Sequence, residues 1–300
     1  MNPVCCIIVT FNIGPHIIKV VENILPQVER LIIVDNGSSD ITPKILESLK
    51  SSQSGKISLV INESNEGIAA ALNTGVKKGL QCGFEWILIL DHDSLAAPDM
   101  VTHMLETHES VIRENPGIIS PVHIDQNTGK RYRYAKYEKI FIRFKSPHDH
   151  PLECSMVMTS GSLIPRKVFE DAGLFNEDYF MYWVDKEFCR RVTHKGYRIF
   201  VSDKAFLHHR EGKSWSKRIL FYDISMKTWE PVSMYYIFRN LICDFRRDSS
   251  ISSRLHSILF LGYLLVSIIL TGGARIERLK AVRDGIRDGR MGKLGKSDLY

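Results

Sequence analysis

Trp86-Ile87-Leu88-Ile89-Leu90 is an apolar run that stops abruptly at Asp91-His92-Asp93-Ser94. An apolar run bounded by a polar break predicts a buried strand, with two carboxylates at its carboxyl end. Open α/β sheets bind their ligands at that end of the strands. Because side chains alternate along a strand, Asp91 and Asp93 should lie on the same side, where both could bind one divalent cation. Asp-x-Asp is also common in turns, so the tripeptide alone does not establish a metal site.

The hundred residues around this run alternate between strand-like and helix-like patterns. Strands are expected at residues 4–10, 31–34, 57–62 and 86–90, and helices at 17–27, 43–50 and 68–79. Strands joined by helices of this length form right-handed crossovers, which predicts an α/β fold with a mostly parallel, Rossmann-like sheet flanked by helices. The polar strand ends should line one nucleotide-binding edge. No GxGxxG or P-loop sequence supports a dinucleotide-binding protein or an NTPase.

Composition narrows the classes of protein. The 300 residues are 44% hydrophobic and 25% charged, which is typical of a globular enzyme. A net charge of +6 suits anionic partners, such as phosphorylated molecules or lipid surfaces, and no nucleic-acid-binding motif is present. The six cysteines form no CxxC pair, and the first residues do not resemble a signal peptide, so we expect a cytoplasmic protein without zinc or a disulfide framework.

A second informative block runs from residue 159 to residue 191. It holds Asp185 and Glu187 directly after the aromatic residues Tyr182 and Trp183. A carboxylate beside aromatic walls suits a general base that acts on a sugar hydroxyl, although acidic residues at a helix start often interact only with the helix dipole. Residues 132–150 show little periodicity and are expected to form a loop or insertion.

Taken in order, these blocks resemble the inverting glycosyltransferases of family 2, which have the GT-A fold, and within that family the bacterial rhamnosyltransferases. The agreement spans nearly the whole chain, and the rhamnosyltransferase subdivision depends mainly on its last two segments. The matching segments are residues 8–12, 34–38, 65–69 with Asn73 and Gly75, 90–94, 160–162, 173–175, 184–188, 209–212, 235–240 and 285–289.

The resemblance implies transfer of a sugar from a nucleoside diphosphate donor, with inversion and with Mg²⁺ or Mn²⁺ as cofactor. It assigns Asp91 to the donor ribose and the metal, Asp93 and His209 to the metal, and Asp185 to the general base. For His209 the alternative is an ordinary histidine, and the neighbouring His208 makes the choice harder. The remaining implied donor residues are Thr10, Phe11, Asn12, Asp35, Asn65 and Gly67, and the implied acceptor residues are Ser160, Gly161, Trp183 and Glu187.

Three of these assignments have open structural alternatives. Asp35 could instead cap the turn of Asp35-Asn36-Gly37-Ser38, and Asn65 and Gly67 could simply form a turn. Glu187 could orient a loop rather than bind acceptor.

We expect a catalytic domain at residues 1–215 and a helical region at 216–300. The catalytic domain should contain a nucleotide-binding half at about 1–95 and an acceptor-binding half at about 96–215. Residues 258–270 are almost wholly apolar, and as a helix of roughly 20 Å they would be too short to cross a bilayer. They could pack on the catalytic domain, form a homo-oligomer, or lie on the membrane surface. We favour peripheral association with the inner face of the cytoplasmic membrane.

The implied reaction is transfer of L-rhamnose from dTDP-L-rhamnose to a growing glycan, with a lipid-linked acceptor. UDP-galactofuranose and UDP-glucose are the alternative donors. Two other classes compete: a phosphohydrolase of the haloacid dehalogenase type and a non-catalytic carbohydrate-binding protein. The former usually carries Asp-x-Asp on its first strand, whereas here the motif is expected on the fourth.

Overall fold

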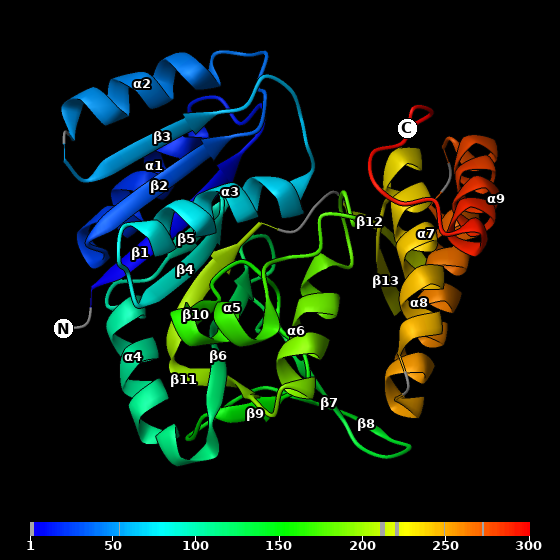
Figure 1. Cartoon of the computed structure of the whole chain (residues 1–300). Helices are drawn as coiled ribbons and strands as arrows, with labels where there is room; N and C mark the ends of the chain where they lie inside the picture. The colour runs from blue at the N-terminus through cyan, green and yellow to red at the C-terminus, as the bar shows by residue number, and fades with distance from the viewer. Residues whose placement is uncertain (1–2, 54, 211–213, 220–221, 249, 272) are drawn as a thin grey trace. The chain divides into compact units, whose positions relative to one another are not determined.

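The computed structural model describes residues 3–53, 55–210, 214–219, 222–248, 250–271 and 273–300 (Figure 1). Glu211 and Gly212, the second half of the 209–212 segment, lie outside the described residues. The chain divides into two compact units. The first comprises Met1–Lys136, Arg143–Glu177 and Val184–Arg210, and the second Tyr137–Ile142, Asp178–Trp183 and Glu211–Tyr300.

The first unit is built on a sheet of nine described strands, in the order β3-β2-β1-β4-β10-β6-β11-β5, with β9 paired to β11. Strands β3, β2, β1 and β4 are parallel, as expected, whereas β10 runs antiparallel to both β4 and β6. The strands are β1 (Val4–Thr10), β2 (Arg30–Asp35), β3 (Ile57–Ile61), β4 (Trp86–Asp91), β5 (Ser94–Ala96), β6 (Pro116–Asp125), β9 (Leu152–Cys154), β10 (Leu163–Pro165) and β11 (Arg198–His209).

Helices cover both faces of the parallel half. Alternate residues of β1 point to opposite faces, so Cys6 and Ile8 join the core that contains α1, while Ile7 faces α3. A Cβ added to Gly75 of α3 would lie 2.3 Å from Ile7 Cγ2, which shows how closely this helix approaches the sheet. The helices are α1 (His16–Ile24), α2 (Thr42–Ser52), α3 (Ile68–Gln81), α4 (Met100–Ser110), α5 (Arg166–Ala172) and α6 (Val184–His194).

Two segments differ from the sequence-based expectation. The first predicted helix ends at Ile24 and continues as a 3₁₀ turn, Leu25–Gln27, because Pro26 has no N–H to donate to the preceding turn. Residues 132–150 contain a two-stranded hairpin, β7 (Tyr134–Tyr137) and β8 (Ile142–Lys145), rather than only a loop. Its first strand is buried only at Tyr134 and Ala135, and so it shows no alternating pattern.

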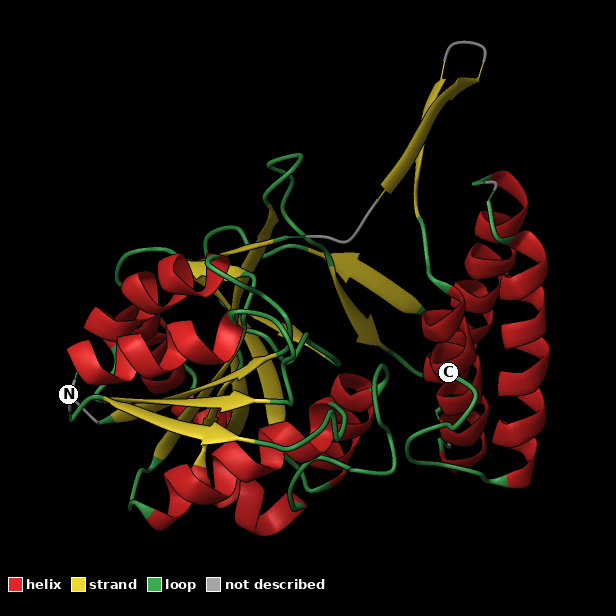
Figure 2. Cartoon of the chain, turned by 90° about the horizontal axis from the view of Figure 1, so that it is seen from above, coloured by secondary structure: helices red, strands yellow, loops and turns green. Residues whose placement is uncertain are grey.

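The second unit contains three helices that lie side by side (Figure 2), as the predicted helical extension requires. They are α7 (Pro231–Arg247), α8 (Ile251–Leu270) and α9 (Arg275–Met291), preceded by the hairpin of β12 (Ser214–Ile219) and β13 (Tyr222–Lys227). The predicted domain boundary at 215/216 falls within β12. Helices α7 and α9 pack very closely. A Cβ added to Gly285 would lie 2.5 Å from the carbonyl oxygen of Tyr235, and a Cβ added to Gly289 would lie 2.7 Å from the carbonyl oxygen of Arg239.

Helix α8 is longer than expected from the sequence. Its 20 residues correspond to roughly 30 Å, because the polar residues of 252–257 continue the apolar run as one helix. The apolar segment 258–270 is therefore only part of a longer helix. Among the described helices it alone has the length and hydropathy that a membrane crossing requires, and most of its apolar window is not buried.

Candidate active site

The two carboxylates that follow β4 lie beside a histidine from the far end of the first unit. One ligand atom each of Asp91, Asp93 and His209 lies within 4.8 Å of the others. Strand β5 brings them together, because it pairs antiparallel with β11 and places Ser94 opposite His209. Ser94 Oγ lies 2.9 Å from His209 Nδ1, and Asp93 Oδ1 lies 3.6 Å from the same nitrogen. The neighbouring His208 is exposed, so the pairing identifies His209 as the histidine of this cluster.

This cluster suits a hard divalent cation. Asp93 Oδ1 is buried and accepts no hydrogen bond from any described residue. A buried carboxylate oxygen without a donor carries a desolvation cost that a bound cation would offset. Two carboxylates and one imidazole are acceptable ligands for Mg²⁺ or Mn²⁺.

Asp91 is held at the tip of β4 by the residues that follow β9. Its backbone N–H donates to Ser160 Oγ at 3.0 Å, and Ser160 Oγ also lies 3.0 Å from Ser94 Oγ. Burial raises the pKa of the Asp91 carboxyl, and the negative charge of Asp93 raises it further, whereas His209 lowers it. Ser160 and Gly161 are buried under this tip, where a Cβ on Gly161 would lie 2.7 Å from Pro121 Cγ. Their contacts support the carboxylates, and their predicted acceptor role stays a prediction.

A buried histidine that the sequence reasoning missed supports the same tip. His123 lies near the end of β6, and its Nε2 is 2.8 Å from the carbonyl oxygen of Ser160, so this nitrogen carries the proton. Its Nδ1 lies 2.9 Å from the hydroxyl of Tyr134. Burial lowers the pKa of His123 to about 4, which keeps the ring neutral at pH 7. One feature of the sequence could have identified His123, namely its position near the end of an apolar strand.

The ends of β1 and β2 form the predicted nucleotide-binding edge. Asp35 is buried, and its Oδ1 accepts hydrogen bonds from Thr10 Oγ1 at 2.8 Å and Ser38 Oγ at 2.7 Å. These bonds are what a turn-capping carboxylate makes, so contact between Asp35 and a base stays a prediction. Asn12 joins the two loops, since its Oδ1 accepts from the N–H of Ser39 at 2.8 Å, and Phe11 beside it is 40% exposed.

Asn36 connects the loops that follow β2 and β3, a role that the sequence reasoning did not assign. Its Nδ2 donates to Asn65 Oδ1 at 3.0 Å, and its Oδ1 accepts from the N–H of Glu66 at 3.2 Å. Asn65 Oδ1 also accepts from the N–H of Gly67, whose φ of +87° is readily adopted only by glycine. Asn65 and Gly67 therefore shape this turn, as their structural alternative proposed.

Gly37→Ala is expected to destabilise the first unit. Gly37 has φ +78°, and an added Cβ would lie 2.5 Å from the backbone carbonyl carbon of Ser64. Gly83→Ala is the matched control, because Gly83 has φ +85° but no described atom within 4 Å of the added Cβ. Urea unfolding should show Gly37→Ala to be about 1–3 kcal/mol less stable than Gly83→Ala. Equal stabilities would contradict the close packing of these loops.

The candidate base Asp185 lies in the first turn of α6. Its Oδ1 accepts from the N–H of Lys186 at 2.8 Å. Burial raises the pKa of the Asp185 carboxyl, and the negative charge of Asp91 adds to the rise. Since that effect depends on proximity, Asp185 belongs to the same electrostatic environment as Asp91.

The two other predicted acceptor residues near α6 have packing partners. Glu187 is buried and forms a bidentate ion pair with Arg191, with distances of 2.7 and 2.9 Å. Arg191 also donates to the carbonyl oxygens of Ala172 and Leu174, so Glu187 orients this loop, the first of its two predicted roles. Trp183 belongs to the second unit, where its Nε1 donates to Asp244 Oδ2 at 3.2 Å.

Curated proteins similar to this chain include two rhamnosyltransferases. The dTDP-rhamnosyl transferase RfbF of Shigella flexneri is 27% identical over 265 residues, which cover 86% of each chain. N-acetylglucosaminyl-diphospho-decaprenol L-rhamnosyltransferase of Mycobacterium tuberculosis is 24% identical over 235 residues, covering 67% of this chain and 74% of the relative.

Solved structures and a family model agree with these relatives. TarS 1-349 of S. aureus in complex with UDP-GlcNAc superposes with a TM-score of 0.57 at 14% identity, over 97% of this chain and 92% of TarS 1-349. GalNAc-T7 with UDP, GalNAc and Mn²⁺ superposes with a TM-score of 0.60 at 13% identity, over 97% of this chain and 56% of the GalNAc-T7 chain. These likenesses confirm the predicted GT-A fold. The family "Glycosyl transferase family 2" matches residues 5–173, more than half of the 300. The chain therefore belongs to glycosyl transferase family 2 and is a glycosyltransferase rather than a phosphohydrolase or a non-catalytic binding protein.

Proposed function

We propose that this glycosyltransferase transfers L-rhamnose from dTDP-L-rhamnose to a growing, lipid-linked cell-surface polysaccharide such as O-antigen. The observation that carries the proposal is the similarity to the Shigella dTDP-rhamnosyl transferase along 86% of both chains. The Mycobacterium relative, named for a lipid diphosphate acceptor, supports a lipid-linked acceptor. UDP-galactofuranose and UDP-glucose remain the alternative donors.

The donor nucleotide would bind at the carboxyl ends of β1, β2 and β3. The exposed ring of Phe11 offers an aromatic surface for the base, and Thr10, Asn12 and Asp35 would form the polar side of the pocket. The turn at Asn65 and Gly67 would let the backbone approach the donor closely.

Asp93, His209 and Asp91 would hold Mg²⁺ or Mn²⁺, with Asp91 also accepting from the ribose. A bound cation stabilises the negative charge that develops on the β-phosphate as the nucleoside diphosphate leaves. Asp93 Oδ1, which has no hydrogen-bond donor among the described residues, and the imidazole beside it support this assignment.

Asp185 would act as the general base. As an acceptor hydroxyl attacks the anomeric carbon, the Asp185 carboxylate removes the hydroxyl proton, and the new bond forms opposite the leaving group. A single displacement of this kind inverts the anomeric configuration. Ser160 fixes the neighbouring Asp91, the N–H of Gly161 donates to the carbonyl oxygen of Ile89 in the same strand, and Glu187 fixes the loop at 172–174. These residues would shape the acceptor side of the site. Trp183, two residues before Asp185 in the sequence, would be a further acceptor residue.

Helices α8 and α9 would place the enzyme on the inner face of the cytoplasmic membrane. Ile258, Leu259 and Ile269 of α8 are exposed. In α9, Arg283, Arg287 and Arg290 line one hollow together with apolar side chains of the same helix. Apolar side chains bordered by arginine suit an anionic lipid surface, and the same face could pair with a second copy of the chain.

A thermal-shift screen with Mn²⁺ tests the donor. A ligand that binds only the folded state raises the unfolding temperature. We expect dTDP-L-rhamnose with Mn²⁺ to give a larger shift than UDP-galactofuranose or UDP-glucose. The screen should be followed by a transfer assay that measures dTDP release with an N-acetylglucosaminyl-diphospho-lipid acceptor. A larger shift with a UDP-sugar would overturn the donor, and no shift with any nucleotide sugar would count against the donor site itself.

A further inference from the structure

Helix α8 of the second unit carries its polar and apolar residues on the opposite sides from those of an ordinary surface helix. Four of its six buried residues are serines. Every exposed residue of α8 is apolar or glycine. A helix on the surface of a soluble protein normally buries its apolar side and turns its polar side to water. The inversion indicates that the outer side of α8 is covered by a partner.

The exposed residues of α8 form one continuous stripe, which we call the α8 stripe. They recur at intervals of three and four positions, as residues on one side of an α-helix do. With exposed fractions from 36% to 66%, its eight larger side chains present on the order of 700 Å² of apolar surface. Monomeric proteins rarely expose a contiguous apolar patch of more than a few hundred Å². The α8 stripe consists of Ile251, Leu255, Ile258, Leu259, Gly262, Leu265, Val266, Ile269 and Leu270.

Contacts on the inner side fix α8 in this orientation. Leu264 and Ile268 belong to the same buried core as residues of α7. The inward serines find acceptors within their own helix, since Ser257 Oγ donates to the carbonyl oxygen of Ser253 at 3.1 Å and Ser267 Oγ donates to that of Leu264 at 2.7 Å. The inner side therefore needs no water, and the helix gains nothing by turning its serines outward.

Gly262 lies near the middle of the α8 stripe and has no packing role within the chain. A Cβ added to it would have no described atom within 4 Å. An exposed glycine inside a helix lowers helix stability relative to alanine, and it offers no side chain to a lipid surface. In the same unit, Gly285 and Gly289 let α9 approach the backbone of α7 closely. Gly262 therefore favours a second helix, rather than lipid, as the partner of the α8 stripe.

The α8 stripe is arranged symmetrically about Gly262. The positions three, four and seven residues to either side of Gly262 all belong to it. When two identical chains pair about a two-fold axis, the same surface meets itself. With Gly262 at the axis, the two helices could approach closely there and bring apolar side chains together on both sides. The stripe holds no charged residue that would oppose its own copy, and its area is close to the roughly 800 Å² per partner of a stable interface.

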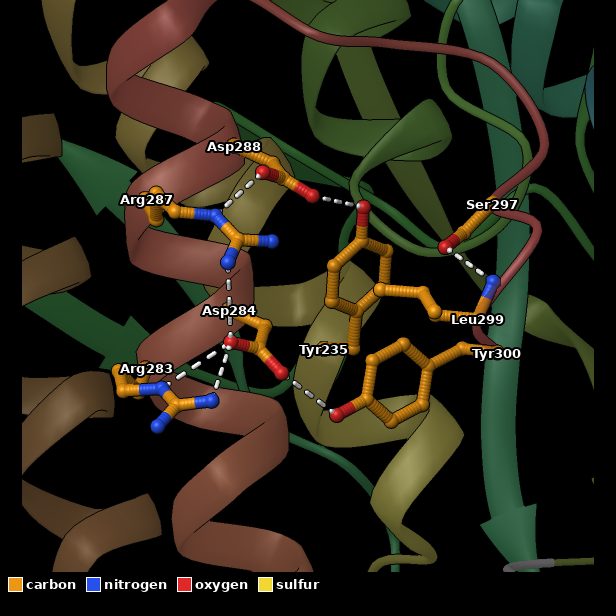
Figure 3. Close-up of polar contacts among 8 residues, drawn as sticks. All are labelled: Tyr235, Arg283, Asp284, Arg287, Asp288, Ser297, Leu299 and Tyr300. Atoms are coloured by element: carbon orange, nitrogen blue, oxygen red, sulfur yellow. Dashed lines mark hydrogen bonds and ion pairs between the residues drawn. The ribbon is translucent and has the colours of Figure 1, made fainter.

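The C-terminal tail of the chain is already engaged elsewhere in the second unit. The hydroxyl of Tyr300 donates to Asp284 Oδ2 of α9 at 3.1 Å, and its ring stacks on that of Tyr235 of α7 with 4.6 Å between centroids (Figure 3). The hydroxyl of Tyr235 also donates to Asp288 Oδ2 at 3.0 Å. The tail is thus held by α7 and α9 and does not cover the α8 stripe.

We infer that the α8 stripe is the interface of a homodimer in which Gly262 of one copy packs against Gly262 of the other. The inference goes beyond the proposed function, because it depends on neither the donor nor the catalytic base. It assigns the α8 stripe to a second copy of the chain, and leaves α9 with its arginines as the part proposed to face lipid.

Gly262→Leu tests the close approach of the two helices. Leucine is a better helix former than glycine, and the space around Gly262 admits it, so the helix should still fold. Two leucine side chains at the axis would force the helices apart. In sedimentation velocity without detergent, we expect the wild type to be a dimer at micromolar concentration and Gly262→Leu to raise the dimer dissociation constant at least 10-fold. A monomeric wild type, or a Gly262→Leu dimer as tight as that of the wild type, would overturn the inference.

A matched pair of leucines locates the interface. Leu265→Ser removes an apolar side chain of the α8 stripe and should also weaken the dimer at least 10-fold. Leu279→Ser makes the same change on α9, where Leu279 is 53% exposed, and should leave the dimer intact. Circular dichroism should show all variants folded. Equal weakening by the two substitutions would overturn the assignment to α8.

Vesicle binding distinguishes a second copy from lipid as the partner of the α8 stripe. A lipid partner predicts that vesicles of phosphatidylglycerol and phosphatidylethanolamine bind Gly262→Leu more tightly than the wild type and Leu265→Ser less tightly, and that result with a monomeric wild type would overturn the inference. The thermal shift with dTDP and Mn²⁺ should be the same in all variants, because the donor would bind in the first unit. Loss of that shift in the wild type would count against the proposed donor site and not against the dimer.

Discussion

Asp185→Asn is expected to lower kcat in the transfer assay about 10³-fold while leaving the thermal shift with dTDP and Mn²⁺ nearly unchanged. General-base catalysis contributes about 10²- to 10⁴-fold, and an amide cannot accept the proton of the acceptor hydroxyl. The substitution keeps the size of the side chain and an oxygen that can accept from the N–H of Lys186. The charge that it removes is one that burial and the negative charge of Asp91 already disfavour, as the raised pKa of the Asp185 carboxyl shows, so the local fold should tolerate the substitution.

Asp203→Asn is the control for this experiment. Asp203 lies in β11, six residues before His209, and undergoes the same chemical change outside the carboxylate cluster. Its kcat should match that of the wild type. If Asp185→Asn retained most of its activity, another group would have to remove the proton, and Asp185 would be only a helix-start carboxylate.

Asp93→Asn should remove the response of the protein to Mn²⁺. The variant replaces the half-buried carboxylate of Asp93 by a neutral amide, and the buried Oδ1 of that carboxylate has no hydrogen-bond donor among the described residues. Stabilisation of a leaving diphosphate by a cation amounts to several kcal/mol, so turnover should fall about 10³-fold. In the thermal-shift experiment, dTDP should give the same small shift with and without Mn²⁺.

Two adjacent histidines provide a matched pair for the same measurement. His209→Gln should weaken the Mn²⁺-dependent shift, because the ring nitrogen of His209 lies near Asp93 Oδ1. His208→Gln should behave as wild type, since alternation along β11 places His208 on the other side of the strand. Equal effects of the two substitutions would contradict the proposed ligand set.

Local sequence patterns predicted the site residues that lie directly at the end of one strand. The apolar run at 86–90 and the polar break after it placed Asp91 and Asp93 at a strand end, where the structure has them. Asp35 was placed at the end of β2 in the same way. These predictions need only the period of a strand and the parallel order that helical crossovers impose.

Features that depend on pairing between distant strands could not be predicted in this way. No local pattern distinguishes His209 from His208, and the choice is made by β5, a strand of three residues that pairs with β11. The antiparallel β10 likewise lacks a signal, because three residues are too few to show alternation. Ser160 was correctly located within an informative block, but its burial under Asp91 depends on hydrogen bonds that span 69 residues.

The contact between Ser94 and His209 joins positions 115 residues apart in the chain. A cation held by Asp93 and His209 would close that loop as a crosslink, in addition to any part it plays in the reaction. Because the ligand set exists only after β5 and β11 have paired, the metal would bind the folded chain and hardly the unfolded one. Cation binding would then favour the assembled first unit over partly unfolded forms, so metal supply would control how much folded enzyme persists as well as how fast it works.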